Sequence, residues 1–345
     1  MLFRGFNLIV RLSSHRRVLR KAIRGFASSA TGSYSDKDPA PYFFNEEVQK
    51  FLKVITRPEH DKVFRRQLDG REIEEPVYKF MTERDLKKAL DTANQNMEEL
   101  LQMPPVVKVR EENVRILSKD PALQGYDDCK FVFTDISFGI KNKDRTIAVR
   151  EPDGTLRTAN HSERDRLNQI YFPLKGREIY MPKMFLQENL EPILNRGDYE
   201  FILNRACIQF DPDNPEYHRI TQVTYDHIDE HQQFDKLRST RHFGPMVFYL
   251  AWNKKVDNLL LENITTDRIE DAALILKVYY KLNPSDNPIE EEDHVKLIQH
   301  YIKTESNIKR KLDHAFKTFL EIEAATKKLE ENIAIAHGQK ITDTT

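Results

Sequence analysis

Cysteine, glycine and long apolar runs are all scarce in this sequence. Only Cys129 and Cys207 are cysteines among 345 residues, and they stand far apart, which excludes zinc ribbons, CxxC redox sites and a disulfide framework. The 11 glycines make up about 3% of the chain, against a usual ~7%, which excludes collagen-like and linker-like proteins. The longest uncharged stretches, such as residues 242–253, fall short of the ~18 residues that a membrane-spanning helix needs. We therefore expect a helix-rich protein of a reducing compartment, with no membrane partner.

Motifs for nucleotide binding or acyl chemistry are also absent. The sequence contains no GxxxxGKS/T, GxGxxG or GxSxG string, so a phosphate-binding Gly-rich loop and a nucleophile elbow have no candidate. One pattern typical of enzymes, H-x-x-E-H, occurs at His227, Glu230 and His231 and resembles the helix of inverted zinc peptidases. Its surroundings are nearly all polar and no third ligand stands out, so we interpret it as a solvated helix face. A zinc peptidase remains the disfavoured alternative, and we expect no enzyme, no metal, no cofactor and no small-molecule substrate.

The first 35 residues differ in charge from the rest of the chain. They contain seven basic residues and no acidic one, although the whole sequence has a net charge of -1. Apolar residues interleave with the arginines, and a small, hydroxyl-rich stretch follows at 27–35. Acid-free amphipathic segments of this kind are typical of mitochondrial transit peptides. We predict that residues 1–35 direct the chain to the mitochondrial matrix; a basic RNA-binding arm is the alternative.

The remaining sequence predicts an α+β fold that is predominantly helical. Asn45 is placed to cap a helix ending before Pro58, and Thr82 with Asp85 forms a capping-box variant before a second helix. The period then changes from three or four residues to two, which predicts strands at 130–138, 146–150 and 155–158 around the turn 151–154. We therefore expect a small antiparallel β-meander in the middle of the chain, with multiple packed helices after it.

Helical patterns dominate after the meander. Helices are expected at 163–171, 186–194, 199–210, 216–231, 245–253, 266–282 and, as one long candidate docked on the domain or on a partner, about 290–336. We divide the chain into the transit peptide (1–35), an N-terminal helical segment (36–128), the sheet with basic loops (129–177), a helical domain (178–289) and a C-terminal helix with its tail (290–345).

Positive charge is concentrated in two blocks of this chain. The first block, at 138–177, lies on and beside the predicted strands, where Lys and Arg can neutralise phosphates without reading bases. Pairing with nearby carboxylates on the surface is the alternative explanation. The candidate phosphate contacts in this block are Lys141, Lys143, Arg145, Arg150, Arg157, Arg164 and Arg166.

The second block, residues 236–255, contains five basic residues and no acidic one. Pro245 is suited to the first position of a helix, which places Arg238 and Arg241 before its N-terminus, where the helix dipole disfavours positive charge. A phosphate held by these two arginines and by the hydroxyls of Ser239 and Thr240 would offset that cost. A bridge to a distant Asp or Glu of the same chain is the alternative.

Five strings carry a resemblance to a known family. They are LQMPPVV (101–107), KFVFTDIS (130–137), VREPDGTLRTA (149–159), ERDRLNQIYFP (163–173) and KLRSTRHFGPMVFY (236–249). In sequence and order they resemble the animal family of mitochondrial small-subunit ribosomal protein twenty-two, over about residues 42–282. Two features depart from the family pattern: Pro245 replaces a second glycine, and the His227/His231 pair is not part of it.

The resemblance implies a non-catalytic structural protein of the small mitochondrial ribosomal subunit. Its implied partners are the small-subunit ribosomal RNA and neighbouring small-subunit proteins. A chain that met RNA over most of its surface would be strongly basic, whereas residues 36–345 contain more acidic than basic residues in total. We therefore expect local contacts with RNA and broad contacts with proteins. A helical matrix adaptor or a ribosome assembly factor is the alternative function.

Overall fold

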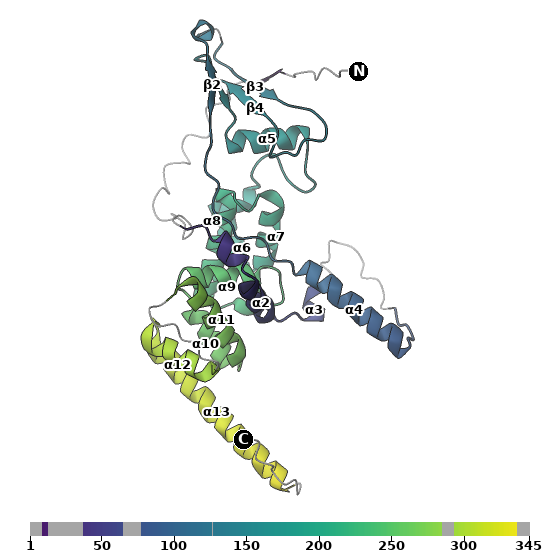
Figure 1. The fold of residues 1–345 in the computed structure, drawn as a ribbon, viewed down its shortest axis with the longest axis vertical. Coiled ribbons are helices and arrows are strands. Elements are labelled where there is room, and N and C mark those ends of the chain that lie inside the picture. The colour runs from purple at the N-terminus through teal and green to yellow at the C-terminus, as the bar shows by residue number, and fades with distance from the viewer. Residues whose placement is uncertain (1–8, 13–36, 65–76, 126, 285–292, 337–345) are drawn as a thin grey trace. The chain divides into compact units, whose positions relative to one another are not determined.

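The computed structural model describes residues 9–12, 37–64, 77–125, 127–284 and 293–336, which belong to two compact units (Figure 1). The sheet unit consists of Val109–Arg196 and Asn204–Ile220 with the described part of the first 35 residues. The helical unit consists of the described parts of Asp36–Lys108, Gly197–Leu203 and Thr221–Thr345. Each unit therefore combines segments that are separated in the sequence. Within the described ranges, no helix is long and apolar enough to span a membrane.

The sheet unit contains an antiparallel sheet with the strand order β1-β3-β4-β5-β2. The predicted meander is confirmed as β3, β4 and β5, and two strands are added at its edges. Of the predicted transit peptide the structure describes only β1; the prediction for residues 1–35 otherwise lies outside the described residues. The strands are β1 (Ile9–Leu12), β2 (Ile116–Lys119), β3 (Lys130–Thr134), β4 (Ile147–Arg150) and β5 (Thr155–Thr158).

The turn between β4 and β5 forms as its sequence predicts. The backbone N–H of Gly154 donates to the carbonyl of Glu151 at 3.0 Å, and Gly154 has a φ of +82°, a conformation that favours glycine. The carbonyl oxygen of Asp120, from the short 3-10 turn η1 (Pro121–Leu123) and its cap, lies where a Cβ at residue 154 would be. Gly154 is therefore required both by its backbone angle and by this close approach.

Helix α5 (His161–Tyr171) covers one face of the sheet. Asn160 and Glu163 form a complete capping box at its start, which fixes where the chain leaves β5 and becomes helical. Leu167 and Tyr171 pack against Val132 and Val149, which are paired across β3 and β4. Arg150 therefore lies on the opposite face of β4 from Val149, whereas Arg157 of β5 is paired with Val149 and lies on the side of α5, where it binds Glu163.

The rest of the sheet unit is helical. Phe185 is completely buried and contacts Phe210, with 5.5 Å between the ring centroids. The predicted helices are confirmed to within a few residues, and the unit division falls inside two of them, α7 and α8. The elements are η2 (Lys183–Phe185), α6 (Gln187–Arg196), α7 (Tyr199–Gln209) and α8 (Pro215–His231).

The helical unit is built around α9. This helix is apolar on all sides, and each residue from Phe243 to Ala251 is buried, as expected for a helix at the centre of a domain. Phe248 contacts Phe43 edge-to-face at 5.2 Å between centroids. The unit contains α1 (Ala40–Phe43), α2 (Glu46–Thr56), α3 (His60–Val63), α4 (Glu83–Leu100), η3 (Phe234–Lys236), α9 (Phe243–Trp252), α10 (Asp257–Thr265), α11 (Ile269–Leu282), α12 (His294–Thr304) and α13 (Lys309–Ala336).

Three predicted helix boundaries in this unit were wrong. Helix α9 begins at Phe243, so Pro245 is its third residue rather than its first. The helix predicted at 266–282 begins at Ile269 and is preceded by α10, which the sequence analysis missed. The long C-terminal candidate is two helices, because the Ser306 hydroxyl accepts from the N–H of Ile308 at 3.1 Å and starts a new one.

Both predicted N-terminal caps of the early helices are confirmed. The Asn45 side chain accepts from the N–H groups of Glu47 and Val48 at the start of α2, and Thr82 accepts from the N–H of Asp85 at the start of α4. The two helices differ in burial, since α2 buries its apolar face whereas no residue of α4 is buried. Helix α4 therefore leaves its apolar face accessible.

Candidate nucleic-acid interface

The first basic block centres on the loop between β3 and β4. Lys141 and Lys143 are exposed in this loop, and the guanidinium of Arg164, from α5, donates to the carbonyl of Lys143 at 2.8 Å and also to that of Arg145. Arg164 is therefore held against the loop by backbone carbonyls. The structure brings these three cations, Lys141, Lys143 and Arg164, to one place.

Arg145 supports this loop from inside and is not available to a phosphate. Arg145 is 3% exposed, and its Nη1 donates to the carbonyls of Asp135 at 3.1 Å and Ser137 at 2.9 Å. Nη2 donates to the carbonyl of Ile140 at 2.9 Å, and the guanidinium lies 3.3 Å from the centroid of the Phe172 ring. The predicted phosphate contact at Arg145 is thus corrected to a structural role.

This use of Arg145 also explains why β3 ends at Thr134 rather than at residue 138. The Asp135 carboxylate accepts from the N–H of Ser137 at 2.9 Å, and Gly139 has a φ of +86°. Carbonyls that would continue the strand ladder bind the guanidinium instead. The chain leaves the sheet here and forms the loop that carries the two lysines.

One consequence of the shortened strand is an exposed aromatic side chain, which the sequence analysis missed. Phe138 is fully exposed and precedes Lys141 by three residues. An exposed aromatic ring beside basic residues is a common arrangement for stacking on an unpaired base. The sequence placed Phe138 in a strand, and only the early end of β3 leaves it in the loop.

Arg157 forms ion pairs with carboxylates of its own chain, which was the alternative explanation for this block. Its Nη2 donates to Glu151 Oε1 at 2.7 Å and its Nη1 to Glu163 Oε2 at 2.8 Å. These hydrogen bonds raise the pKa of Arg157 and hold the pKa of Glu163 below its usual value. Arg157 thus joins the β4–β5 turn to the first turn of α5, with both of its charged partners on its own chain.

Arg150 and Arg166 have weaker internal contacts. Arg150 is half-buried and donates to the carbonyl of Gly154 at 3.2 Å. Arg166 is exposed on α5, donates to the Tyr180 hydroxyl at 3.0 Å and lies 5.2 Å from the centroid of that ring. The acceptors in these bonds are a carbonyl and a hydroxyl. The positive charge of each arginine is therefore not neutralised by a carboxylate there.

The second block is organised around a buried arginine in the helical unit. Arg238 is 2% exposed; its Nη2 donates to Glu262 Oε2 at 2.5 Å and its Nε to Asp235 Oδ1 at 3.0 Å. Asp271 lies 3.8 Å from Nη1 and itself binds Arg57 at 2.6 Å. Carboxylates of α10 and α11 therefore supply the negative charge that the sequence analysis assigned to a phosphate. Arg238 forms the alternative, a bridge to distant Asp and Glu residues of the same chain.

The other predicted phosphate ligands of this block are also engaged within the chain. The Ser239 hydroxyl donates to the carbonyl of Arg57, and the Thr240 hydroxyl to that of Leu237. Half-buried Arg241 donates to His242 Nε2 at 3.4 Å. His242 is buried, and burial, followed by the charge of Arg241, lowers its pKa to about 3. Residues 238–242 thus form an internal junction.

The H-x-x-E-H pattern lies on α8 without a metal-binding arrangement. The rings of His227 and His231 stack at 4.1 Å between centroids, and the Tyr199 hydroxyl lies 3.0 Å from His227 Nδ1. Burial, followed by the neighbouring His231, lowers the pKa of His227. Within the described ranges, no group of three or more His, Cys, Asp or Glu residues is placed to hold a metal ion.

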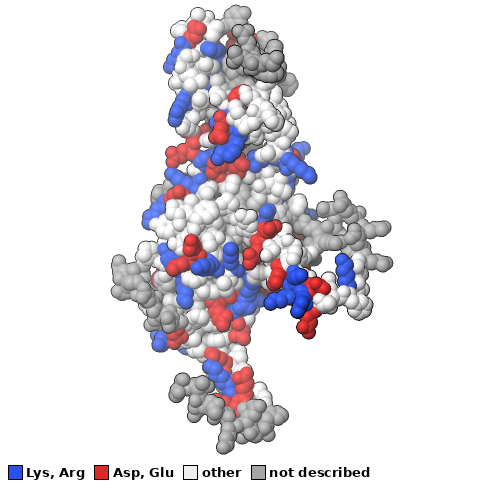
Figure 2. Space-filling model, turned by 45° about the vertical axis from the view of Figure 1, so that its right-hand side comes forward, with Lys and Arg blue, Asp and Glu red and all other residues white. Residues whose placement is uncertain are grey.

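Lys and Arg do not form one continuous surface on the face shown in Figure 2. Blue and red residues are interspersed over that face. The loop with Lys141, Lys143 and Arg164, extended by Phe138, is therefore a local feature. It is suited to a small number of phosphate and base contacts.

Comparison with known proteins agrees with the resemblance in the sequence. A family model described as mitochondrial 28S ribosomal protein S22 matches residues 41–284. The chain is 38% identical over 304 residues to small ribosomal subunit protein mS22 of Mus musculus, a match that covers 87% of this chain and 84% of the mouse protein. It is 39% identical over 288 residues to small ribosomal subunit protein mS22 of Bos taurus, which covers 82% of this chain and 79% of the bovine protein. The chain therefore belongs to the mitochondrial ribosomal protein S22 family.

Proposed function

We propose that this chain is a non-catalytic structural component of the small subunit of the mitochondrial ribosome, in the matrix. The names of its mouse and bovine relatives support membership of the small subunit. We propose further that it contacts ribosomal RNA locally, through the loop 138–143 and the adjoining start of α5. The observation that carries this step is the exposure of Phe138, Lys141 and Lys143 on a loop whose backbone carbonyls bind the buried Arg145.

The expected RNA contact combines charge with stacking. Lys141, Lys143 and Arg164 neutralise phosphates, and Phe138 stacks on a base that is not paired. Arg150 and Arg166 supply further positive charge from β4 and α5. Arg145 and Arg157 act through the loop and the turn that they hold in place.

Broad protein contacts account for the apolar surface of the helical unit. Helix α4 exposes Leu86, Leu90 and Leu100, each more than half accessible, and the segment before it exposes Tyr78 and Phe80. Apolar surface of this extent on a soluble chain marks sites of interaction with other proteins. A neighbouring protein of the small subunit that packs against α4 and the segment before it would cover these apolar side chains.

Charge reversal in the loop tests the RNA contact. Lys141→Glu with Lys143→Glu should reduce incorporation of the chain into the small subunit and weaken its retention as salt is raised, because each lost phosphate contact reduces the salt-dependent part of binding. Lys175→Glu with Lys183→Glu reverses two exposed lysines of the same unit outside the loop and should have little effect. Equal effects from the two pairs would refute the loop as the RNA contact.

Sedimentation separates a resident protein from the alternative, an assembly factor or matrix adaptor. A resident protein remains with mature small subunits at moderate salt, whereas an assembly factor leaves as they mature. Import is tested separately by fusing residues 1–35 to a passenger protein. Retention of that fusion in the cytosol would contradict the transit-peptide prediction.

A further inference from the structure

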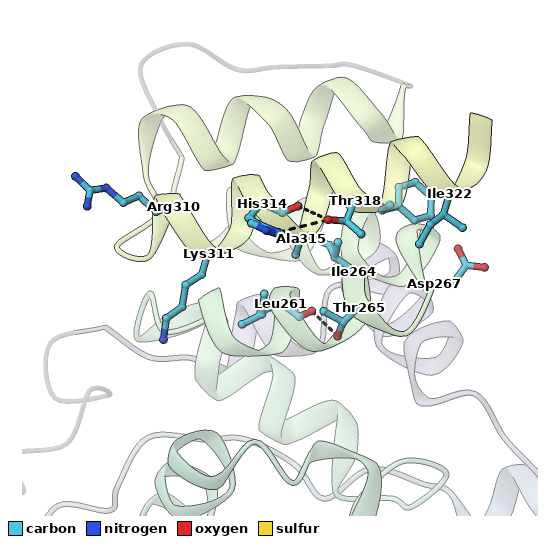
Figure 3. Close-up of a pocket in the computed structure, with 11 residues that line it drawn as sticks. Leu261, Ile264, Thr265, Asp267, Arg310, Lys311, His314, Ala315, Thr318 and Ile322 are labelled. Atoms are coloured by element: carbon cyan, nitrogen blue, oxygen red, sulfur yellow. Dashed lines mark hydrogen bonds between the residues drawn. The ribbon is translucent and has the colours of Figure 1, made fainter. Parts of the chain in front are cut away.

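An apolar groove lies between α10 and the first half of α13 in the helical unit (Figure 3). Its volume is about 670 Å³. Leu261 and Ile264 line it from α10, and Ala315, Phe319 and Ile322 line it from α13. A pocket of this shape between two helices is suited to the side chains of a third helix.

The hydroxyl groups near the groove do not make it polar. Thr265 donates to the carbonyl of Leu261 at 2.9 Å, and Thr318 donates to that of His314 at 3.0 Å, as the dashed lines in Figure 3 mark. Thr326, farther along α13, donates to the carbonyl of Ile322 at 2.9 Å. Each hydroxyl proton is thus used within its own helix, which leaves the methyl groups as the contact surface.

The apolar face continues along α13 beyond the groove. Ala315, Phe319, Ile322, Thr326, Leu329 and Ile333 alternate in steps of four and three residues, which are the a and d positions of a heptad repeat. We call these six residues the α13 seam. At 1.5 Å per residue the seam is about 27 Å long. Ile322 and Leu329 are each 61% exposed and Ile333 is 50% exposed, so the far half of the seam lies uncovered.

The α13 seam is distinct from the face by which α13 packs on its own unit. Leu312 is fully buried and Phe316 is 2% exposed, and these two residues lie beside the seam rather than on it. The intrachain packing of α13 is therefore centred on Leu312 and Phe316, and the seam borders it at Phe319, whose ring centroid lies 6.4 Å from that of Phe316. It leaves a second apolar stripe on the same helix.

Charge differs in sign between the two ends of the groove. Arg310 and Lys311 stand at one end of the groove, and Asp267 stands at the other end, near Ile322. Among the described residues, neither Arg310 nor Lys311 has an ion-pair partner. Glu323, which binds Lys327 at 2.7 Å, and Glu330 flank the far half of the seam. The seam is thus an apolar stripe bordered by charges of both signs rather than a basic surface, which favours a protein partner over RNA.

We propose that the groove and the α13 seam together bind an amphipathic α-helix of a neighbouring protein. Its apolar residues follow the same repeat of three and four. It carries carboxylates where it passes Arg310 and Lys311, and Lys or Arg where it passes Asp267 and Glu330. This inference rests on the proposed residence in the small subunit, which supplies the neighbour.

Site-specific crosslinking in assembled subunits tests the partner class. A photoreactive amino acid replaces Ile322 in the full-length chain, small subunits are purified by sedimentation, and crosslinked peptides are sequenced. The expected product joins Ile322 to a peptide of another protein that has the stated apolar repeat and charges. The same group at Ala324, which is exposed on the opposite side of α13, should not give this product.

Other products would overturn the proposal. Crosslinks at position 322 only to RNA, only to a second copy of this chain, or to no other molecule would each refute it. Sedimentation of the chain is measured before crosslinking. Its absence from the small subunit would refute the proposed function, and the docking assignment with it, whereas its presence without the helix product refutes the docking assignment alone.

Binding of the identified helix, as a synthetic peptide, to the full chain gives the quantitative test. Ile322→Glu with Leu329→Glu should raise Kd at least tenfold, and both side chains are exposed, so the fold should be kept. Ala324→Glu with Lys328→Glu is the matched control and should leave Kd unchanged. Arg310→Glu with Lys311→Glu should also weaken binding, and a peptide with Lys in place of its carboxylates should restore it. Unchanged Kd in the seam variant, or no rescue by the Lys peptide, would overturn the assignment.

Discussion

Replacing Arg238 with alanine should destabilise the helical unit strongly. The substitution removes the guanidinium that binds Glu262 at 2.5 Å and lies 3.8 Å from Asp271, and both carboxylates are buried or nearly so. Breaking a buried ion pair by removing one partner costs about 3–5 kcal/mol, because a charge is left buried without compensation. Asp271 still binds Arg57 and Glu262 still contacts Arg268, so we expect the lower part of that range.

The loss should depend on pH. In the native chain, burial raises the pKa of Glu262 above its usual value, while Arg238 and Arg268 lower it. Without Arg238 this pKa rises further, so the folded state binds a proton more tightly than the unfolded state. The destabilisation of Arg238→Ala relative to the native chain should therefore be largest at pH 7 and should shrink as the pH falls towards 5.

The measurement is urea unfolding of the full chain followed by tryptophan fluorescence. Trp252 is the only tryptophan of the sequence, and its ring stacks on Phe248 of α9 at 5.8 Å between centroids, so it reports on this unit. Arg241→Ala, at a half-buried position, is the control and should cost about 1 kcal/mol or less. A loss below about 1 kcal/mol for Arg238→Ala, or one that does not vary with pH, would refute the buried-network argument.

Three further predictions concern single positions. Gly154→Ala should destabilise its part of the sheet more than Gly139→Ala does, since both residues have positive φ but only a Cβ at residue 154 would collide with a neighbouring carbonyl. Amide hydrogen exchange of β3, β4 and β5 would show the difference, and equal effects would contradict the collision. Arg145→Ala should cost about 3 kcal/mol in unfolding free energy through three lost carbonyl contacts, whereas Lys143→Ala should leave stability unchanged, so similar losses would argue against the structural role of Arg145. His242→Gln should make the free energy of unfolding less sensitive to acid between pH 6.5 and 4. The lowered pKa of His242 keeps it neutral in the folded state in this range, whereas the unfolded chain takes up a proton there and is favoured by acid. An unchanged pH dependence of unfolding would contradict this.

The parts of the structure that the sequence predicted are those set by local interactions. The caps at Asn45 and Thr82 and the turn ending at Gly154 each involve residues within a few positions of one another. Side-chain identity and spacing are sufficient for such features. The α+β class and most helix positions followed from the same local signals.

The site required information that local patterns do not contain. Arg238 has partners 24 and 25 residues away, and no spacing rule connects them. Arg145 binds backbone carbonyls, which every residue possesses, so its burial leaves no sequence signature. Phe138 became a candidate only because β3 ends early. A basic residue in a sequence can therefore be counted as a phosphate ligand only after its own chain has been searched for acceptors.

The order of the two units along the chain has a consequence for folding. The helical unit receives α2 from before the sheet unit and α9 to α13 from after it, and the hydrogen bond between Ser239 and Arg57 joins residues 182 positions apart. Contacts at such separation form slowly, because the closure of a long loop must precede them. The β3–β4–β5 meander of the sheet unit pairs strands that are close in sequence, so it can form while α2 still lacks its partners. A chain synthesised from its N-terminus therefore carries α2 with its apolar face uncovered until α9 and α11 have followed, and exposed apolar surface of this kind is prone to aggregation during that interval.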